Sequence, residues 1–126
     1  MNQKTIDLEA RLIRFAVRVI SIAESLPGTK AGNHLANQLV RSGTSPALNY
    51  GEAQDAESKT NFIHKLKIVT KELRETRVSL QIIQLMGATD LANDLRESLD
   101  ECNQLISIFV KSIRTSRNTS QGPRTS

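Results

Sequence analysis

The chain has 126 residues, enough for one domain with a modest core, and its formal net charge at pH 7 is +4. It contains one Tyr, three Phe and no Trp, so aliphatic side chains must fill the interior, which suits packed helices better than a β-sandwich. A single Cys excludes an internal disulfide, and neither a signal peptide nor an apolar run of membrane-spanning length is present, so we expect a cytoplasmic protein without a membrane partner.

Residues 7–26 are predicted to form the first helix, which Pro27 and Gly28 end. Its buried seam repeats at helical spacing: Leu8, Leu12, Phe15, Val19, Ile22 and Leu26. A second stripe widens the apolar face: Ile13, Ala16, Ile20 and Ala23. The outside of a lone bundle needs only one stripe, so we expect the second to contact another subunit.

The segment 30–57 is ambiguous. Ser42 to Pro46 has the composition of a turn, and propensity favours a break there, with Ser45 as the N-cap of a new helix and Pro46 at its first position. The alternative is one continuous helix. Small residues would then line one side of it at spacings of 4, 3, 4 and 4: Ala36, Val40, Gly43, Ala47 and Gly51. Such a groove would allow a neighbouring helix to pack closely.

Two long helices are predicted after residue 57. Residues 58–86 carry the seam Phe62, Leu66, Val69, Leu73, Thr76, Leu80 and Ile83, with Ser58 as the N-cap and Gly87 as the stop. After Thr89 or Asp90 as a cap, the last helix carries Leu91, Leu95, Leu99, Cys102, Ile106, Phe109 and Ile113. We expect a bundle domain over residues 1–114 and a disordered polar tail over residues 115–126.

The positive charge is unevenly distributed. Residues 58–87 carry six basic and two acidic side chains, whereas the charges of residues 1–57 cancel. Two basic stripes are candidates for nucleic-acid contact: Arg11, Arg14 and Arg18, and Lys67, Lys71 and Arg74. The alternative interpretation, that they are solvated helix faces, is favoured by pairs such as Lys71 and Glu75. Because no aromatic residues alternate with them, binding would follow backbone charge rather than base identity.

A polar motif sits in the ambiguous segment. Its residues are Arg41, Ser42, Thr44, Ser45, Asn49 and Glu52. Through this motif and the residues on either side of it, the chain resembles the four-helix-bundle proteins encoded in intervening sequences of bacterial 23S rRNA genes. Gln38 and Leu39 precede the motif. The matching residues after it are Phe62, Lys65, Leu66, Lys71, Glu72, Leu73, Glu75 and Thr76. The resemblance covers roughly residues 5–113.

The resemblance implies an all-α, up-down-up-down four-helix bundle whose second helix continues through Gly43–Pro46, where a kink is allowed. It also implies a homo-oligomer, a pentameric ring, and a similarity to the accessory proteins of diversity-generating retroelements, which bind nucleic acid and a reverse transcriptase. The six polar motif residues would either contact a ligand or RNA, or hydrogen-bond across a close helix contact. We favour the second interpretation because the motif flanks the small-residue groove.

Enzymatic chemistry is poorly supported. His34 and His64 fall on different predicted helices and lack the Glu-x-x-His spacing of a di-iron bundle. Glu52, Asp55 and the acidic start of the last helix form the only candidate carboxylate cluster, and Cys102 occupies a core position. We therefore expect no cofactor, no metal and no catalytic residue. The favoured hypothesis is an oligomeric accessory protein that binds structured RNA or nucleoprotein, and the alternative is a protein-interaction scaffold.

Overall fold

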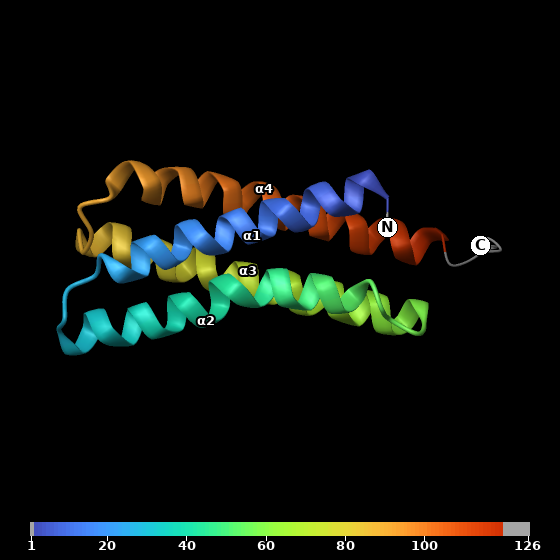
Figure 1. Ribbon diagram of the computed structural model, residues 1–126, viewed down its shortest axis with the longest axis horizontal. Helices are drawn as coiled ribbons and strands as arrows, with labels where there is room; N and C mark the ends of the chain where they lie inside the picture. The colour runs from blue at the N-terminus through green and yellow to red at the C-terminus, as the bar shows by residue number, and fades with distance from the viewer. Residues whose placement is uncertain (1, 120–126) are drawn as a thin grey trace.

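The computed structural model describes residues 2–119, which form four α-helices and no β-strand. The helices are α1 (Gln3–Glu24), α2 (Lys30–Ala53), α3 (Lys59–Met86) and α4 (Ala92–Asn118). They run alternately in opposite directions along one long axis (Figure 1), and α4 closes the bundle against α1. The predicted four-helix bundle is confirmed. Within residues 2–119, none of the helices has the length and apolarity needed to cross a membrane.

The core consists largely of the seams predicted for α1, α3 and α4, joined by Leu39 of α2 and Leu105 of α4, which those seams did not include. The largest side chains with almost no exposed surface come from all four helices: Leu12, Phe15, Ile22, Leu39, Leu66, Leu73, Leu80, Ile83, Leu105 and Phe109. The rings of Tyr50 and Phe109 meet edge to face with centroids 5.4 Å apart. The aliphatic composition therefore builds a core from helix stripes, with one aromatic pair joining α2 and α4.

Helix α2 is continuous, so the predicted break between Ser42 and Pro46 is wrong. Pro46 lies inside the helix and is buried. Proline has no N–H, and in a helix interior it costs about 3 kcal/mol. The buried face of α2 explains why the helix nevertheless continues: Leu39, Gly43, Pro46 and Tyr50 follow one another at helical spacing and all face the core. Tertiary packing thus outweighs the local propensity on which the prediction relied.

The small-residue groove of α2 receives α1, as the alternative prediction required. A Cβ atom built on Gly43 would lie 2.5 Å from Cγ1 of Val19, which is fully buried. Farther along α2, a Cβ on Gly51 would meet only Glu9, at an ordinary 3.5 Å. Of these two glycines, only Gly43 lies so close to α1 that a side chain would overlap it. In the second α1 stripe, Ala16 and Ala23 are buried, whereas Ile13 and Ile20 are exposed.

The helix ends agree with the predictions in part. Ser58 caps α3 by accepting a hydrogen bond from the Asn61 amide, and Gly87 ends it in the left-handed conformation with φ of 62°. α1 begins at Gln3, not at residue 7, because the Asn2 side chain accepts from the Thr5 amide at 2.8 Å. Neither Thr89 nor Asp90 caps α4: Leu91 occupies the cap position without a side-chain hydrogen bond.

The last helix is longer than expected. α4 continues to Asn118, so its last four residues fall in the segment that was assigned to the tail. Its end contacts the start of α3, where Lys59 Nζ donates to Thr119 Oγ1 at 3.3 Å. The remainder of the predicted tail, residues 120–126, lies outside the described residues.

The Gly43 contact is testable by substitution. We expect Gly43→Ala to lower the free energy of unfolding by about 1–3 kcal/mol, because the stiff, β-branched Val19 cannot move away from the new methyl group. Gly51→Ala is the matched control and should be neutral or stabilising by up to about 1 kcal/mol, through helix propensity alone. Chemical denaturation of both variants measures the difference. Equal effects of the two changes would contradict the close approach at Gly43.

Candidate nucleic-acid interface

A basic groove runs between the first half of α3 and the last turns of α4. Its volume is about 520 Å³, and its cationic side chains are Lys67, Lys71, Arg74, Arg114 and Arg117. Thr70, Val110 and Ile113 line the floor. The spacing along α3 places Lys67, Lys71 and Arg74 on one face, and α4 brings its own arginines to the opposite wall. No carboxylate lines the groove within the described part of the chain.

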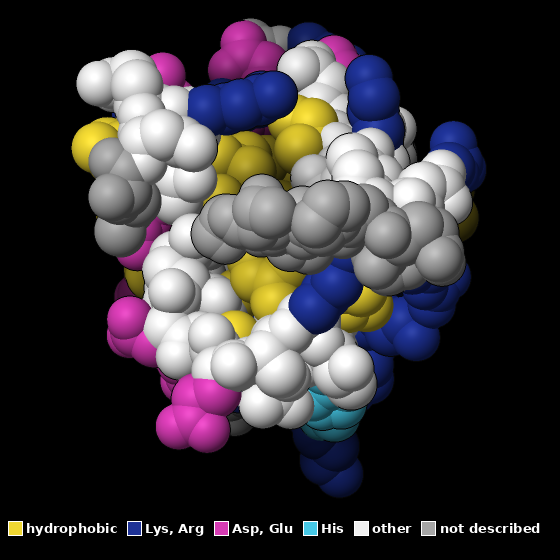
Figure 2. All heavy atoms as spheres, turned by 90° about the vertical axis from the view of Figure 1, so that its right-hand side faces the viewer, with side chains coloured by type: hydrophobic (Ala, Val, Ile, Leu, Met, Phe, Trp, Pro, Cys, Tyr) yellow, Lys and Arg dark blue, Asp and Glu magenta, His cyan; other side chains and the backbone are white. Residues whose placement is uncertain are grey.

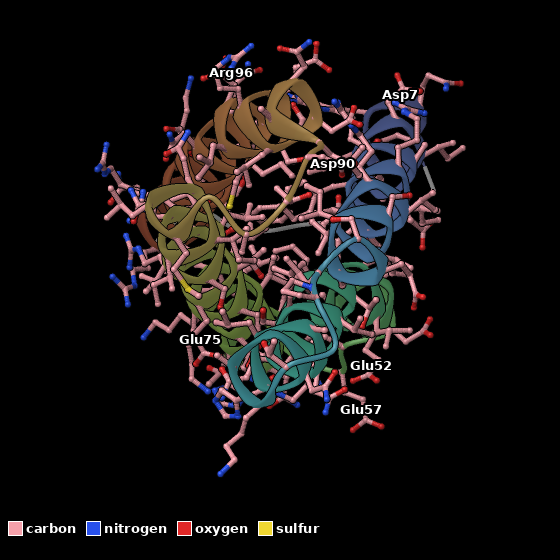
Figure 3. All side chains as sticks on the ribbon, turned by 90° about the vertical axis from the view of Figure 1, so that its left-hand side faces the viewer. Asp7, Glu52, Glu57, Glu75, Asp90 and Arg96 are labelled. Atoms are coloured by element: carbon pink, nitrogen blue, oxygen red, sulfur yellow. The ribbon has the colours of Figure 1, made fainter. Side chains whose placement is uncertain are left out.

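The two sides of the bundle differ in charge. Figure 2 views the end at which α4 finishes, and Lys and Arg side chains gather on the side of the bundle where α3 lies. In Figure 3, seen from the other end, Asp7, Glu52 and Glu57 lie on the side of α1 and α2. Many side-chain nitrogens project from α3 and α4 on the other side, where Glu75 also lies. The excess positive charge is thus gathered on one side of the bundle.

The α3 stripe is only partly neutralised. Lys71 lies 3.6 Å from Glu72 and 3.8 Å from Glu75. Lys67 and Arg74 are exposed and form no ion pair within residues 2–119. Their charges can therefore act on a bound anion without first breaking an internal pair.

Two of the three arginines of the α1 stripe are paired with carboxylates of α4. Arg11 makes a bidentate pair with Glu101, at 2.9 Å from Nε and 2.8 Å from Nη2, and also donates to Gln104. Its hydrogen bond to Glu101 raises the pKa of Arg11, so the charge stays in place. Arg18 is paired with Glu97 and lies 3.8 Å from Asp94. Both arginines thus tie α1 to α4.

Arg14 differs from its two neighbours on the stripe. It is exposed and makes no ion pair within residues 2–119. Of the three α1 arginines, Arg14 alone is therefore unpaired within residues 2–119, and none of the three lines the groove between α3 and α4.

Arg41, the first residue of the polar motif, connects α2 to α3. Its guanidinium donates to Glu72 at 3.1 Å and to Glu75 at 2.8 Å. These hydrogen bonds and the two carboxylate charges raise its pKa, with the bond to Glu75 contributing most. Glu72 is buried, so Arg41 and Lys71 supply the positive charge that its carboxylate needs inside the bundle. Arg41 therefore has a structural partner.

The other motif residues also have partners inside the bundle. Ser42 is buried and accepts from Thr76 Oγ1 at 2.9 Å, and Glu52 pairs with Lys65 of α3. Within α2, Thr44 donates to the Val40 carbonyl at 2.8 Å, and Asn49 donates to Ser45 Oγ at 2.9 Å. Arg41, Ser42 and Glu52 therefore connect α2 to α3, whereas Thr44, Ser45 and Asn49 bond within α2.

The candidate enzymatic groups are scattered. Glu52 lies near the end of α2, at the opposite end of the bundle from the acidic start of α4, so the predicted carboxylate cluster does not form (Figures 1 and 3). His34 and His64 are exposed on different helices. Within residues 2–119, no three His, Cys, Asp or Glu side chains are placed to hold a metal ion.

The single thiol is shielded. Cys102 is fully buried and donates to the Leu73 carbonyl at 3.2 Å. Burial raises its pKa to about 12, so the thiol stays protonated at any ordinary pH.

Sequence reasoning missed the α4 wall of the groove. Arg114 and Arg117 lie three residues apart, directly after the last member of the α4 seam, which is a signal that the sequence did contain. It was overlooked because the helix was expected to end before Arg117. With the helix extended to Asn118, both arginines come to face the α3 cations.

Comparisons with known proteins agree with this architecture. A family profile of the 23S rRNA-intervening sequence proteins matches residues 4–111. A crystal structure from Bacteroides thetaiotaomicron, described as a protein of unknown function from the S23 ribosomal protein family, is similar with a TM-score of 0.79 and 25% identity. The similarity covers 89% of this chain and 99% of that one. No curated protein sequence matches the chain.

Replacing Arg41 separates the two interpretations of the polar motif. We expect Arg41→Met to lower the free energy of unfolding by about 1.5–3 kcal/mol, because the buried Glu72 carboxylate loses a charged hydrogen-bond donor. RNA affinity, measured at a temperature where the variant is fully folded, should stay unchanged. Loss of RNA affinity with unchanged stability would instead assign Arg41 to the ligand.

The shielding of Cys102 predicts its reactivity. The native protein at pH 8 should not react with an aromatic disulfide reagent over minutes, since the thiolate is the reactive species and is not populated. The same protein in denaturant should release one equivalent of chromophore. Rapid reaction of the native protein would show that the α3–α4 contact opens readily.

Proposed function

This chain belongs to the family of 23S rRNA-intervening sequence proteins, and we propose that it is a non-enzymatic, oligomeric accessory protein that binds structured RNA, alone or in nucleoprotein. The groove between α3 and α4 is the proposed binding surface. A cytoplasmic location, where the lone Cys102 would stay reduced, is part of the proposal.

The observation that carries the proposal is the convergence of five cations on a groove without a carboxylate. Phosphate neutralisation by Lys and Arg supplies most of the sequence-independent affinity for nucleic acid. From Lys67 to Arg74 the α3 wall extends about 10 Å, at 1.5 Å rise per residue, which is long enough to contact more than one phosphate of a strand. The arginines of α4 can approach the same strand from the other wall.

The groove favours backbone recognition over base reading. Its floor is aliphatic, and no aromatic ring lines it within the described residues. The rings of Phe15, Tyr50 and Phe109 are buried in the core. Stacking platforms for exposed bases are mainly aromatic rings, so we expect recognition chiefly by charge and shape, with the 2′-hydroxyl as the feature that distinguishes RNA.

Self-association is the second part of the proposal. The exposed stripe on α1 supports it, since Ile13 and Val17 are about half exposed on a helix whose core face is already complete. An assembly of several copies, such as the pentamer that the family resemblance implies, would repeat the groove. The potential over its surface would rise accordingly.

Binding should be measured by fluorescence anisotropy with a labelled RNA hairpin and with duplex DNA, across a series of salt concentrations. We expect Lys67→Glu combined with Arg114→Glu to weaken RNA binding at least tenfold, and to reduce the slope of log affinity against log salt by about 1.5. Two phosphate contacts are removed in this variant. The matched control is Arg14→Glu with Arg96→Glu, which changes the charge equally but at exposed arginines outside the groove.

The control variant should change the affinity by less than about threefold, from its effect on net charge alone. Equal losses in both variants would show that net charge, rather than the groove, determines binding. Negligible binding of the unmodified protein at low salt would overturn the proposal and favour the protein-interaction scaffold.

A further inference from the structure

Two helices of the bundle carry apolar stripes that nothing covers within residues 2–119. On α1 the stripe consists of Ile13, Val17 and Ile20, and on α3 it consists of Val78, Ile82 and Leu85. Leu85 is 91% exposed, and the others range from 36% to 58%. Both stripes repeat at spacings of three and four residues, the pattern of a helix face that packs against another helix.

A charged residue lies one turn beyond each stripe. Glu24 follows Ile20 by four residues on α1, and Arg74 precedes Val78 by four residues on α3. Both side chains are exposed, and neither takes part in an ion pair within the described residues. The α1 stripe thus ends in an anion at its C-terminal end, and the α3 stripe begins with a cation at its N-terminal end.

The two stripes match when the helices are antiparallel. From Ile13 to Glu24 and from Arg74 to Leu85 the separation is eleven residues in each case, about 16 Å of helix at 1.5 Å rise per residue. The antiparallel register places Glu24 opposite Arg74, Ile20 opposite Val78, Val17 opposite Ile82, and Ile13 opposite Leu85. A parallel arrangement would place Glu24 against Leu85 and leave both charges without a partner.

We infer that the α1 stripe of one copy of this chain docks antiparallel on the α3 stripe of a second copy. This inference deepens the self-association part of the proposed function and rests on it. The contact is heterologous, because the two partners use different surfaces. Each copy therefore keeps one unused stripe after the first contact, and association continues until the assembly closes on itself.

Two single variants test the pairing by light scattering after size-exclusion chromatography. Val17→Asp removes the α1 stripe, and Ile82→Asp removes the α3 stripe. We expect each variant alone to be a monomer, and an equimolar mixture of the two to give a heterodimer, since each contributes its intact stripe. The controls are Gln3→Asp and Gln84→Asp, which add the same charge at exposed positions away from the two stripes and should keep the mass of the unmodified protein.

Three results would overturn the inference. The first is a monomeric unmodified protein at tens of micromolar. The second is an Ile82→Asp variant that keeps the full assembly, which would show α1 packing on α1. The third is a mixture of the two variants that stays monomeric while circular dichroism shows both to be folded.

The register is tested separately by exchanging the charges. Glu24→Arg should weaken association about tenfold or more, because it faces Arg74 with a like charge. Combining it with Arg74→Glu should restore association to within about threefold, since the pair is reformed in reverse. Failure of the double variant to recover would reject the antiparallel register.

Arg74 lines the groove and also lies at the end of the α3 stripe, so RNA binding and assembly are separated with variants that leave Arg74 in place. The masses are measured without RNA, and the Lys67→Glu, Arg114→Glu variant should keep the full assembly because neither residue lies in a stripe. A full assembly that binds no RNA would reject the proposed ligand and leave the docking intact. A monomer that binds RNA would reject the docking and leave the proposed ligand intact.

Discussion

The contact between Val19 and Gly43 fixes how the rest of the bundle is arranged. At this point α1 and α2 approach so closely that a methyl group on Gly43 would overlap Val19. With α1 held there, its Leu12 and Phe15 side must face the core and its Ile13 and Val17 side must face outward. The same contact turns the opposite edge of α2, which carries Arg41 and Ser42, toward α3. One small residue thereby determines which faces are buried and which remain available.

Which charged side chains form ion pairs depends on which helix faces meet inside the bundle. Arg11 and Arg18 form ion pairs with the carboxylates of α4 that face α1. Arg41 and Lys71 form ion pairs with Glu72 and Glu75 of α3. Such pairs neutralise the interfaces between helices and contribute modestly to stability when they are exposed. What remains is the positive charge of the α3–α4 groove, where Lys67 and Arg74 form no ion pair among the described residues and where no carboxylate is part of the lining. The groove is therefore a consequence of where the internal pairs form.

The sequence predicted the fold better than it predicted the site. Apolar seams at helical spacing located α1, α3 and α4, and Ser58 and Gly87 marked the ends of α3, because these signals are local. The course of α2 was not predictable from local propensity, since Pro46 is tolerated only through packing with distant residues. The role of Arg11 likewise depends on Glu101, ninety residues away in the sequence. Charge spacing on one helix could not show which cations a neighbouring helix would neutralise.

We propose that the α3–α4 groove, and not the α1 arginines, meets the phosphates of RNA. Nuclear magnetic resonance of uniformly ¹⁵N-labelled protein during titration with a structured RNA hairpin tests this most directly, because arginine side-chain resonances report on each guanidinium separately. We expect the Arg114 signal to shift and broaden while those of Arg11 and Arg18 remain in place. Shifts at Arg11, Arg14 and Arg18 with an unperturbed groove would contradict the proposal.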